Sequence, residues 1–177
     1  MNKLFYVPLL AILLVAESCD YGKFELSDPA VVSKLPVFER LPASVTGLTF
    51  ANYIKEDVKT QENVFDFDYF YNGAGVGIAD LDNDGLQDLV FTGNQEDNKL
   101  YRNKGGLQFE DVTHQSGINE GKGWANGVTF VDINQDGWLD IYICQGGLRS
   151  AAKRRNKLFI NRQGMNCLLY TSDAADD

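Results

Sequence analysis

The stretch DLDNDGLQD, residues Asp80–Asp88, decides the fold, because four of its nine residues are aspartates and its one glycine, Gly85, follows the third of them. Two like charges about 4 Å apart repel by ~1 kcal/mol in water and by ~4 kcal/mol near a protein surface. A cation held by the loop would turn this repulsion into attraction. The stretch DINQDGWLD, residues Asp132–Asp140, repeats the pattern downstream. The sequence therefore indicates two cation-binding loops.

The spacing within these loops suits calcium. In D-x-D-x-D-G-x-x-D, the carboxylates at alternate positions converge when the backbone curls, a turn that Gly85 permits. Calcium takes about six to eight hard oxygens, and a backbone carbonyl and a last carboxylate extend the set. The expected ligands are Asp80, Asp82, Asp84, the Leu86 carbonyl and Asp88 in the first loop, and Asp132, Asn134, Asp136, the Trp138 carbonyl and Asp140 in the second. Asn134 removes one charge, so we expect weaker binding in the second loop.

An EF-hand is excluded as the source of this pattern. It requires a glutamate at the twelfth loop position and flanking helices. That position is Phe91 in the first loop and Ile143 in the second, and both loops have strand-like flanks. A solvated acidic turn without metal is the other alternative, and the aligned second copy argues against it. We expect dissociation constants of about 10⁻⁴–10⁻³ M, typical of extracellular modules.

The acidic loops lie inside an internal repeat. GVGIADLDNDGLQDLVFTGN, residues 75–94, aligns with GVTFVDINQDGWLDIYICQG, residues 127–146, at a distance of 52 residues. NKLYRN, residues 98–103, aligns with NKLFIN, residues 156–161, at 58, so the later copy has six extra residues in an inserted loop. Each copy indicates strand, acidic loop, strand, turn, strand, turn, strand.

These units predict an all-β fold, a partial β-propeller of about two four-stranded blades. Units of roughly 50 residues have the size of a blade, and no helical apolar stripe follows the N-terminal segment. LQFEDVT, residues 107–113, supplies the fourth strand of the first copy, and we expect the second copy to lack its counterpart. GLTFANYI, residues 47–54, alternates as a strand does, and the aromatic segment at residues 62–73 is expected to be extended.

Both ends of the chain differ from the repeats. Lys3 and the apolar run Leu4–Ala16 are typical of a secretory signal. We expect a lipoprotein-type signal helix that ends before Cys19, with Cys19 as the lipidated residue. The alternative is an ordinary signal-peptidase cut after Ser18. CLLYTSDAADD, residues 167–177, resembles the translation of a sequencing-library adapter, the alternative being a genuine polar tail. The expected organisation is a signal peptide over residues 1–19, a tether over 20–36, N-terminal strands and the first repeat over 37–120, a truncated second repeat over 121–166, and a non-native tail over 167–177.

Composition limits the possible functions. The chain has 177 residues, of which 44% are hydrophobic, and a formal net charge of −9. This is enough for one domain with a real core. The acidic balance argues against nucleic acid as a partner, because nucleic-acid-binding surfaces are basic. Of the three cysteines, Cys144 lies in an apolar run and is expected to be a buried structural thiol, and no intramolecular disulfide is expected.

Other conspicuous residues have ordinary explanations. The single histidine, His114, is expected in a surface turn without a catalytic partner. Trp124 and Trp138 could stack on sugars, although packing between blades is the preferred interpretation. The run Lys153–Arg155 is expected to be a solvated loop, with contact to an acidic ligand as the alternative. Asp66 and Asp68 are expected to lie on the solvated face of a strand rather than to act as an acid–base pair.

The loop, its flanking glycines and NKLYRN occur together and twice over about residues 38–165, and this combination resembles the FG-GAP/VCBS repeat family. It is also similar to the N-terminal part of large Bacteroidetes surface proteins that carry such repeats ahead of an ASPIC/UnbV domain. The resemblance implies calcium-binding β-propeller blades of the integrin α-subunit type, with the loop ligands given above.

The expected function is a calcium-stabilised binding or scaffold module of an exported protein. The predicted partners are a protein or glycan ligand at the cell surface and the membrane itself, through the lipid anchor. The expected location is the outer membrane or cell surface, or alternatively the periplasm or the medium. We expect the fragment not to be an enzyme. The alternatives are the substrate-binding scaffold of a surface enzyme whose catalytic domain lies beyond these residues, and a purely structural spacer.

Overall fold

The computed structural model of the protein describes residues 38–119, 121–147 and 154–170. The chain divides into two units after Glu39, and the fold described below is that of the second unit, from Arg40 onward. The predicted signal peptide, the predicted lipidation site Cys19 and the tether over residues 20–36 lie outside the described residues. These parts of the sequence analysis therefore stay predictions.

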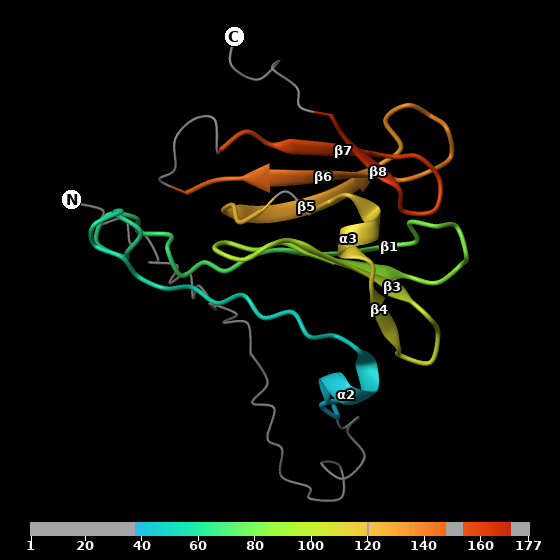
Figure 1. Ribbon diagram of the computed structural model, residues 1–177, viewed down its shortest axis with the longest axis horizontal. Helices are drawn as coiled ribbons and strands as arrows, with labels where there is room; N and C mark the ends of the chain where they lie inside the picture. The colour runs from blue at the N-terminus through green and yellow to red at the C-terminus, as the bar shows by residue number, and fades with distance from the viewer. Residues whose placement is uncertain (1–37, 120, 148–153, 171–177) are drawn as a thin grey trace, which may run out of the picture. The chain divides into compact units, whose positions relative to one another are not determined.

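The second unit contains two antiparallel sheets of four strands each (Figure 1). The first sheet contains β1 (Val76–Ala79), β2 (Asp88–Phe91), β3 (Lys99–Asn103) and β4 (Phe109–Asp111), and the second contains β5 (Ala125–Val131), β6 (Asp140–Gln145), β7 (Lys157–Asn161) and β8 (Cys167–Tyr170). In both sheets the spatial order follows the sequence order. This meander is the arrangement of a propeller blade, so the prediction of an all-β fold with two four-stranded blades is confirmed.

The strand register repeats between the two sheets. Ile78 pairs with Leu89 across β1 and β2, and the residues 52 positions later, Phe130 and Ile141, pair across β5 and β6. Val90 pairs with Leu100 across β2 and β3, and their counterparts in the second repeat, Tyr142 and Leu158, pair across β6 and β7. The internal repeat in the sequence is therefore a repeat of backbone hydrogen bonding.

The second sheet is complete, which corrects one expectation. We expected its fourth strand to be missing, but residues 167–170 form β8 and pair with β7 from Leu158↔Tyr170 to Asn161↔Cys167. A short segment with alternating half-buried and exposed side chains is sufficient to extend an open sheet edge. The interpretation of residues 167–177 as a non-native tail stays a prediction.

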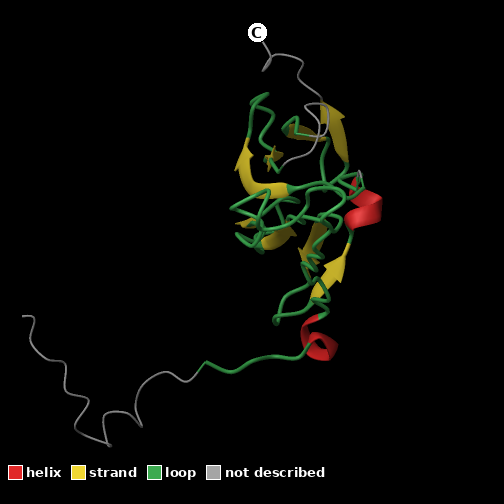
Figure 2. Ribbon diagram, turned by 90° about the vertical axis from the view of Figure 1, so that its left-hand side faces the viewer, coloured by secondary structure: helices red, strands yellow, loops and turns green. Residues whose placement is uncertain are grey.

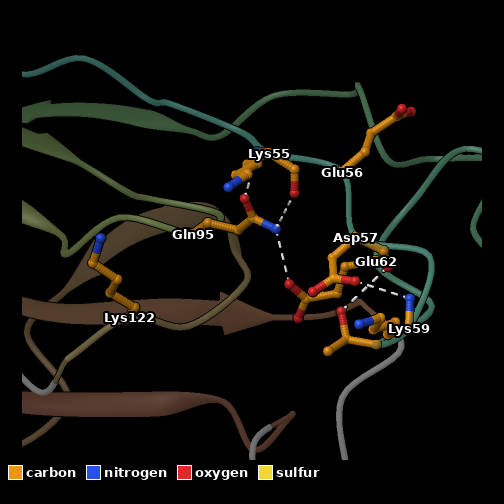
Figure 3. Close-up of a pocket in the computed structure, with 8 residues that line it drawn as sticks. Lys55, Glu56, Asp57, Lys59, Glu62, Gln95 and Lys122 are labelled. Atoms are coloured by element: carbon orange, nitrogen blue, oxygen red, sulfur yellow. Dashed lines mark hydrogen bonds between the residues drawn. The ribbon is translucent and has the colours of Figure 1, made fainter.

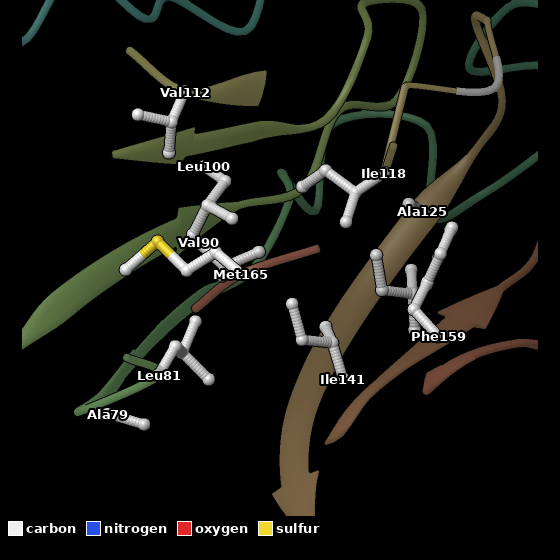
Figure 4. Close-up of a cluster of buried hydrophobic side chains, with 11 residues drawn as sticks. Ala79, Leu81, Val90, Leu100, Val112, Ile118, Ala125, Ile141, Phe159 and Met165 are labelled. Carbon is white, nitrogen blue, oxygen red and sulfur yellow. The ribbon is translucent and has the colours of Figure 1, made fainter. Parts of the chain in front are cut away.

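The core lies between the facing sides of the two sheets (Figure 4). Alternation along each strand directs every second side chain inward, and the register brings these side chains together. Gly77 of β1 contacts β5 closely: a Cβ at this position would lie 2.7 Å from the ring of Phe130. The buried cluster consists of Ala79, Leu81, Val90, Leu100, Val112, Ile118, Ala125, Ile141, Ile143, Phe159 and Met165.

Helix is limited to two single turns among the described residues (Figure 2). These are α2 (Ala43–Thr46) and α3 (Thr113–Ser116), and each ends at a glycine in the left-handed conformation, Gly47 at φ 77° and Gly117 at φ 78°. His114 is exposed on α3, where a surface turn was expected. No helix in the described ranges has the length and apolar character needed to cross a membrane.

The predicted strand at residues 47–54 is wrong. This segment lies against the outer face of the first sheet instead of pairing with its edge. Phe50 stacks on Phe91 with ring centroids 5.2 Å apart, and the Thr49 N–H donates to the Tyr101 hydroxyl at 3.3 Å. The segment covers Tyr101, which is fully buried. Its alternation therefore reflects packing against a sheet and not membership of one.

The aromatic segment at residues 62–73 is also not extended, because side-chain hydrogen bonds fold it into consecutive turns. Asn63 accepts hydrogen bonds through its side-chain oxygen from the N–H groups of Phe65 at 2.9 Å and Asp66 at 3.1 Å. Such local bonds compete with strand pairing. Asp66 and Asp68 are exposed as expected, but they lie in turns rather than on a strand.

Candidate calcium loops and their polar network

The acidic loop between β1 and β2 gathers three carboxylates. One oxygen from each of Asp80, Asp82 and Asp88 lies within 4.8 Å of the other two, the only such group in the part of the chain that the structure describes. Asp88 is fully buried, and the other two side chains are partly buried. Convergent carboxylate oxygens are the ligands that calcium prefers.

One carboxylate oxygen of Asp82, Oδ1, is buried without a hydrogen-bond partner. The other oxygen, Oδ2, lies 3.0 Å from Nε of Arg102. That contact is an ion pair without hydrogen-bond alignment, because the same Nε is also unpartnered as a hydrogen-bond donor. An unsatisfied buried carboxylate oxygen is costly, and a bound cation would satisfy it. The three residues therefore fit a calcium ion.

The carboxylates of Asp80 and Asp84 also bind the backbone of the first loop. Asp80 accepts hydrogen bonds from the N–H groups of Asp84 at 3.1 Å and Gly85 at 2.9 Å. Asp84 is not in the group of three, and it accepts from the N–H of Leu86 at 2.8 Å. Leu86 lies near the tip of the loop with a partly exposed side chain. These bonds curl the backbone around Gly85, whose φ of 88° requires a residue without a side chain.

The second loop has the same side-chain to backbone hydrogen bonds as the first, but its predicted ligands are arranged differently. Asp132 accepts from the N–H groups of Asp136 at 3.0 Å and Gly137 at 2.9 Å, and Asp136 accepts from the N–H of Trp138 at 2.9 Å. Asn134 donates through Nδ2 to the second oxygen of Asp136 at 2.9 Å. An amide that binds its neighbouring carboxylate closes the loop on itself, and no group of three carboxylates is found in this loop among the described residues.

The last aspartate of each loop is a buried structural anchor. Asp88 accepts from the N–H groups of Leu81 at 2.9 Å and Asn103 at 2.8 Å. Its counterpart Asp140, also fully buried, accepts from Ile133 at 3.1 Å and Asn161 at 2.8 Å. Each carboxylate thus ties its loop to the third strand of its own blade. Burial raises the pKa of Asp88, the hydrogen bonds from Asn103 and Leu81 lower it, and the net shift is upward.

Two asparagines of the network were not singled out by the sequence analysis. Asn103 donates through Nδ2 to the Gln87 carbonyl at 2.8 Å, and Asn161 donates to the carbonyls of Leu139 at 3.2 Å and Leu81 at 2.8 Å. The last bond joins the two blades, since Leu81 belongs to the first. The signal that could have found these residues was the repeated final asparagine of NKLYRN and NKLFIN.

A second group of amides joins the opposite strand ends. The side chains of Asn52 and Asn94 are bonded at 2.7 Å, and Asn94 also donates to the carbonyl of Ala125 in the second blade at 3.3 Å. Asn98 accepts from the N–H of Gly93 at 3.0 Å. The blades are therefore connected by polar bonds at both ends of their strands as well as by the apolar core.

A polar hollow of about 660 Å³ lies beside these amides (Figure 3). Its lining has three lysines and three acidic residues, so its formal charge is balanced. Gln95 bridges the hollow: it accepts from the N–H of Lys55 at 2.6 Å and donates to the Lys55 carbonyl at 3.0 Å and to Glu62 at 2.8 Å. These bonds attach the segment around residues 55–62 to the β2–β3 connection, which is a structural role.

The remaining residues singled out from the sequence have clear places. Trp124 is 3% exposed and packs against Phe70 with ring centroids 5.3 Å apart. This residue therefore has a packing role, but its aromatic partners lie in the segment before the first blade rather than between the blades. Trp138 is partly buried in the second loop. Arg154 and Arg155 are exposed, and Lys153 lies outside the described residues.

Cys144 corrects another expectation, because its thiol is exposed rather than buried. It alternates along β6 with the buried residues Ile141 and Ile143, so it lies on the opposite face of the strand. The apolar run suggested burial on both faces, whereas the second blade is covered on one face only among the described residues.

The fold and loops define a class: propeller blades in which an acidic, oxygen-rich loop joins the first two strands. Residues 64–143, which contain both acidic loops, match a family model described as FG-GAP-like repeat. This match supports the predicted FG-GAP repeat. The chain is also similar to Cartilage acidic protein 1 of Xenopus tropicalis, with 28% identity over 72 residues. Those residues are 41% of this chain and 11% of that relative, so the chain spans a small part of the relative's length.

Proposed function

We propose that the protein is a calcium-stabilised binding or scaffold module of an exported protein, built from integrin-like propeller blades. The convergence of Asp80, Asp82 and Asp88, with an unpartnered buried oxygen on Asp82, is the observation that supports calcium. The ion would neutralise the repulsion within the loop and hold the β1–β2 connection together. Each occupied site would contribute roughly 1.4 kcal/mol at free calcium ten times the dissociation constant.

The location and the partners belong to the same proposal. Export and anchoring through Cys19 rest on the N-terminal signal pattern, and they place the module at the outer membrane or cell surface. Calcium is abundant outside the cytoplasm, which suits loops of modest affinity. The partner class is a protein or glycan ligand. We further propose that the module is not itself an enzyme, since its single histidine, His114, is exposed on the short turn α3.

Thermal unfolding of the full chain with and without calcium tests the proposal. Millimolar calcium should raise the unfolding midpoint by several degrees over a sample in EDTA, and magnesium should be less effective because it binds reluctantly to flexible oxygen cages. Asp82→Asn should remove most of the calcium effect. Asp68→Asn, at an exposed aspartate outside the loops, is the matched control and should leave it unchanged.

The second loop provides a gain-of-function variant. Asn134→Asp restores the charge pattern of the first loop and removes the amide that donates to Asp136. It should increase the calcium-dependent shift of the midpoint. The calcium proposal fails if the parent protein shows no shift at millimolar calcium, or if Asp82→Asn retains the full shift.

A further inference from the structure

A second hollow, of about 510 Å³, lies at the strand ends opposite to the acidic loops. The segment that leads into β1 forms one side, and the start of β5 and the end of β6 form the other. Its volume falls within the range of about 300–1,000 Å³ that is usual for small-molecule sites. It is lined by Phe67, Tyr69, Asn72, Gly73, Ala74, Asn126 and Gly147.

An aromatic side chain forms an exposed shelf in this hollow. Tyr69 is 64% exposed, and its ring centroid lies 6.0 Å from that of Phe67 in an edge-to-face arrangement. Phe67 in turn makes an edge-to-face contact with the buried Trp124 at 5.6 Å. The shelf is therefore supported from below by the packed interior. A fixed exposed ring offers a large contact surface at little cost in conformational entropy.

Two free amides lie beside the aromatic shelf. The side chains of Asn72 and Asn126 have no hydrogen-bond partner in the described ranges, and both residues are exposed. Each amide can donate two hydrogen bonds and accept two. Gly73, which also lines the hollow, borders open space, since no atom would lie within 4 Å of a Cβ at this position.

The hollow has no charged side chain in its lining, in contrast to the hollow of Figure 3. A ligand that suits it must be neutral, must present an apolar face to Tyr69, and must carry hydroxyl or amide groups for the two asparagines. A pyranose ring has this combination, because its C–H face stacks on aromatic rings while its hydroxyls form hydrogen bonds. Acidic sugars are disfavoured by the chain's net charge of −9.

We propose that this hollow binds one neutral pyranose unit of a glycan. The inference rests on the proposed binding function and names the ligand class and the residues involved. Tyr69 would stack on the ring, and Asn72 and Asn126 would bind its hydroxyls. Because the site and the acidic loops lie at opposite ends of the strands, calcium stabilises the scaffold without contacting the sugar.

Saturation-transfer NMR on the full chain in calcium tests this proposal. The probes are the methyl β-pyranosides of glucose, galactose and N-acetylglucosamine. We expect at least one of them to receive saturation, strongest at the C–H protons of one ring face. Tyr69→Ala and Asn126→Ala should each weaken binding by about tenfold, and Tyr69→Phe should retain most of it through stacking. Tyr53→Ala is the matched control, because Tyr53 is 74% exposed and does not line the hollow.

The melting midpoint of every variant in calcium, measured alongside, shows that the fold is intact. The sugar proposal is overturned if the folded parent binds none of the three probes, or if Tyr69→Ala and Tyr53→Ala bind equally well. The two proposals fail separately: a calcium-dependent midpoint without sugar binding rejects only the pyranose site, and sugar binding without a calcium-dependent midpoint rejects only the calcium role.

Discussion

Replacing Asp140 by alanine tests whether the last aspartate of each acidic loop is a structural anchor. The side chain is fully buried and accepts hydrogen bonds from the N–H groups of Asn161 at 2.8 Å and Ile133 at 3.1 Å. Alanine removes both acceptors and leaves both donors without a partner. A buried unsatisfied donor costs about 1–3 kcal/mol.

The expected loss follows from the surroundings of the two donors. The N–H of Asn161 is buried and would bear the full cost, whereas Ile133 is 54% exposed, so water can reach its N–H in part. We therefore expect Asp140→Ala to lower the free energy of unfolding by about 2–4 kcal/mol. Asp140→Asn keeps one acceptor and should lose about half as much. For a domain stabilised by about 5–15 kcal/mol, either loss is substantial.

Urea unfolding followed by tryptophan fluorescence measures this effect, with EDTA present so that calcium does not contribute. Trp124 is buried beside Phe67 and reports on the packed state. For a slope of about 2 kcal/mol/M, Asp140→Ala should lower the midpoint by about 1–2 M. Asp68→Ala, at an exposed position, is the control. A change for Asp140→Ala within about 0.5 kcal/mol, the range of surface substitutions, would refute the anchoring role.

Two further predictions concern the cysteines and one ion pair. Burial, with the nearby charge of Asp140, raises the pKa of Cys167 to about 12, whereas Cys144 is exposed. Iodoacetamide should therefore alkylate Cys144 at least tenfold faster than Cys167. Peptide mass spectrometry measures both rates, and faster alkylation of Cys167 would contradict the structure. Burial acts to raise the pKa of Asp111, but the hydrogen bonds from Lys99 at 2.8 Å and from Thr113 outweigh it and hold that pKa below its ordinary value. The stability from this pair is then present above the unfolded pKa of ~3.9 and is lost as the pH falls through the lower folded pKa. Both side chains are about one-third exposed, so solvent screening weakens the ion pair. Asp111→Asn should therefore lower the free energy of unfolding at neutral pH by only about 0.5 kcal/mol. Below about pH 4, the melting midpoint of this variant should depend less on pH than that of the parent.

The positions of strands β1 to β7 and of the two loops could be predicted because their causes are local. Alternating side chains around the acidic stretches define two faces, and the glycines Gly85 and Gly137 define the bends. The repetition at a distance of 52 residues then implied equal units, and the register of Ile78 with Leu89 and of Phe130 with Ile141 agrees with it. Each of these features depends on residues within one blade.

Contacts between segments far apart in the sequence decided the rest. Residues 47–54 have the pattern of a strand, yet they pack on the face of the first sheet instead of pairing with its edge. Phe50 stacks on Phe91, and the N–H of Thr49 donates to the Tyr101 hydroxyl. Arg102 of β3 lies 3.0 Å from Oδ2 of Asp82, a contact that no loop spacing predicts. The second loop differs for a local reason that the spacing alone does not show, because Asn134 donates through Nδ2 to Asp136 and closes the loop.

The sequence alone therefore determined the number of repeated units, their strands apart from β8, and the position of the acidic loops, because periodicity and turn chemistry act over a few residues. The tertiary structure decided which face of each strand is covered, which carboxylates meet, and that Phe67, Tyr69 and Asn126 line one hollow. These outcomes depend on which segments pack against one another, within a blade as well as between the blades and the segment before them, and a periodic pattern carries no information about what lies opposite to it.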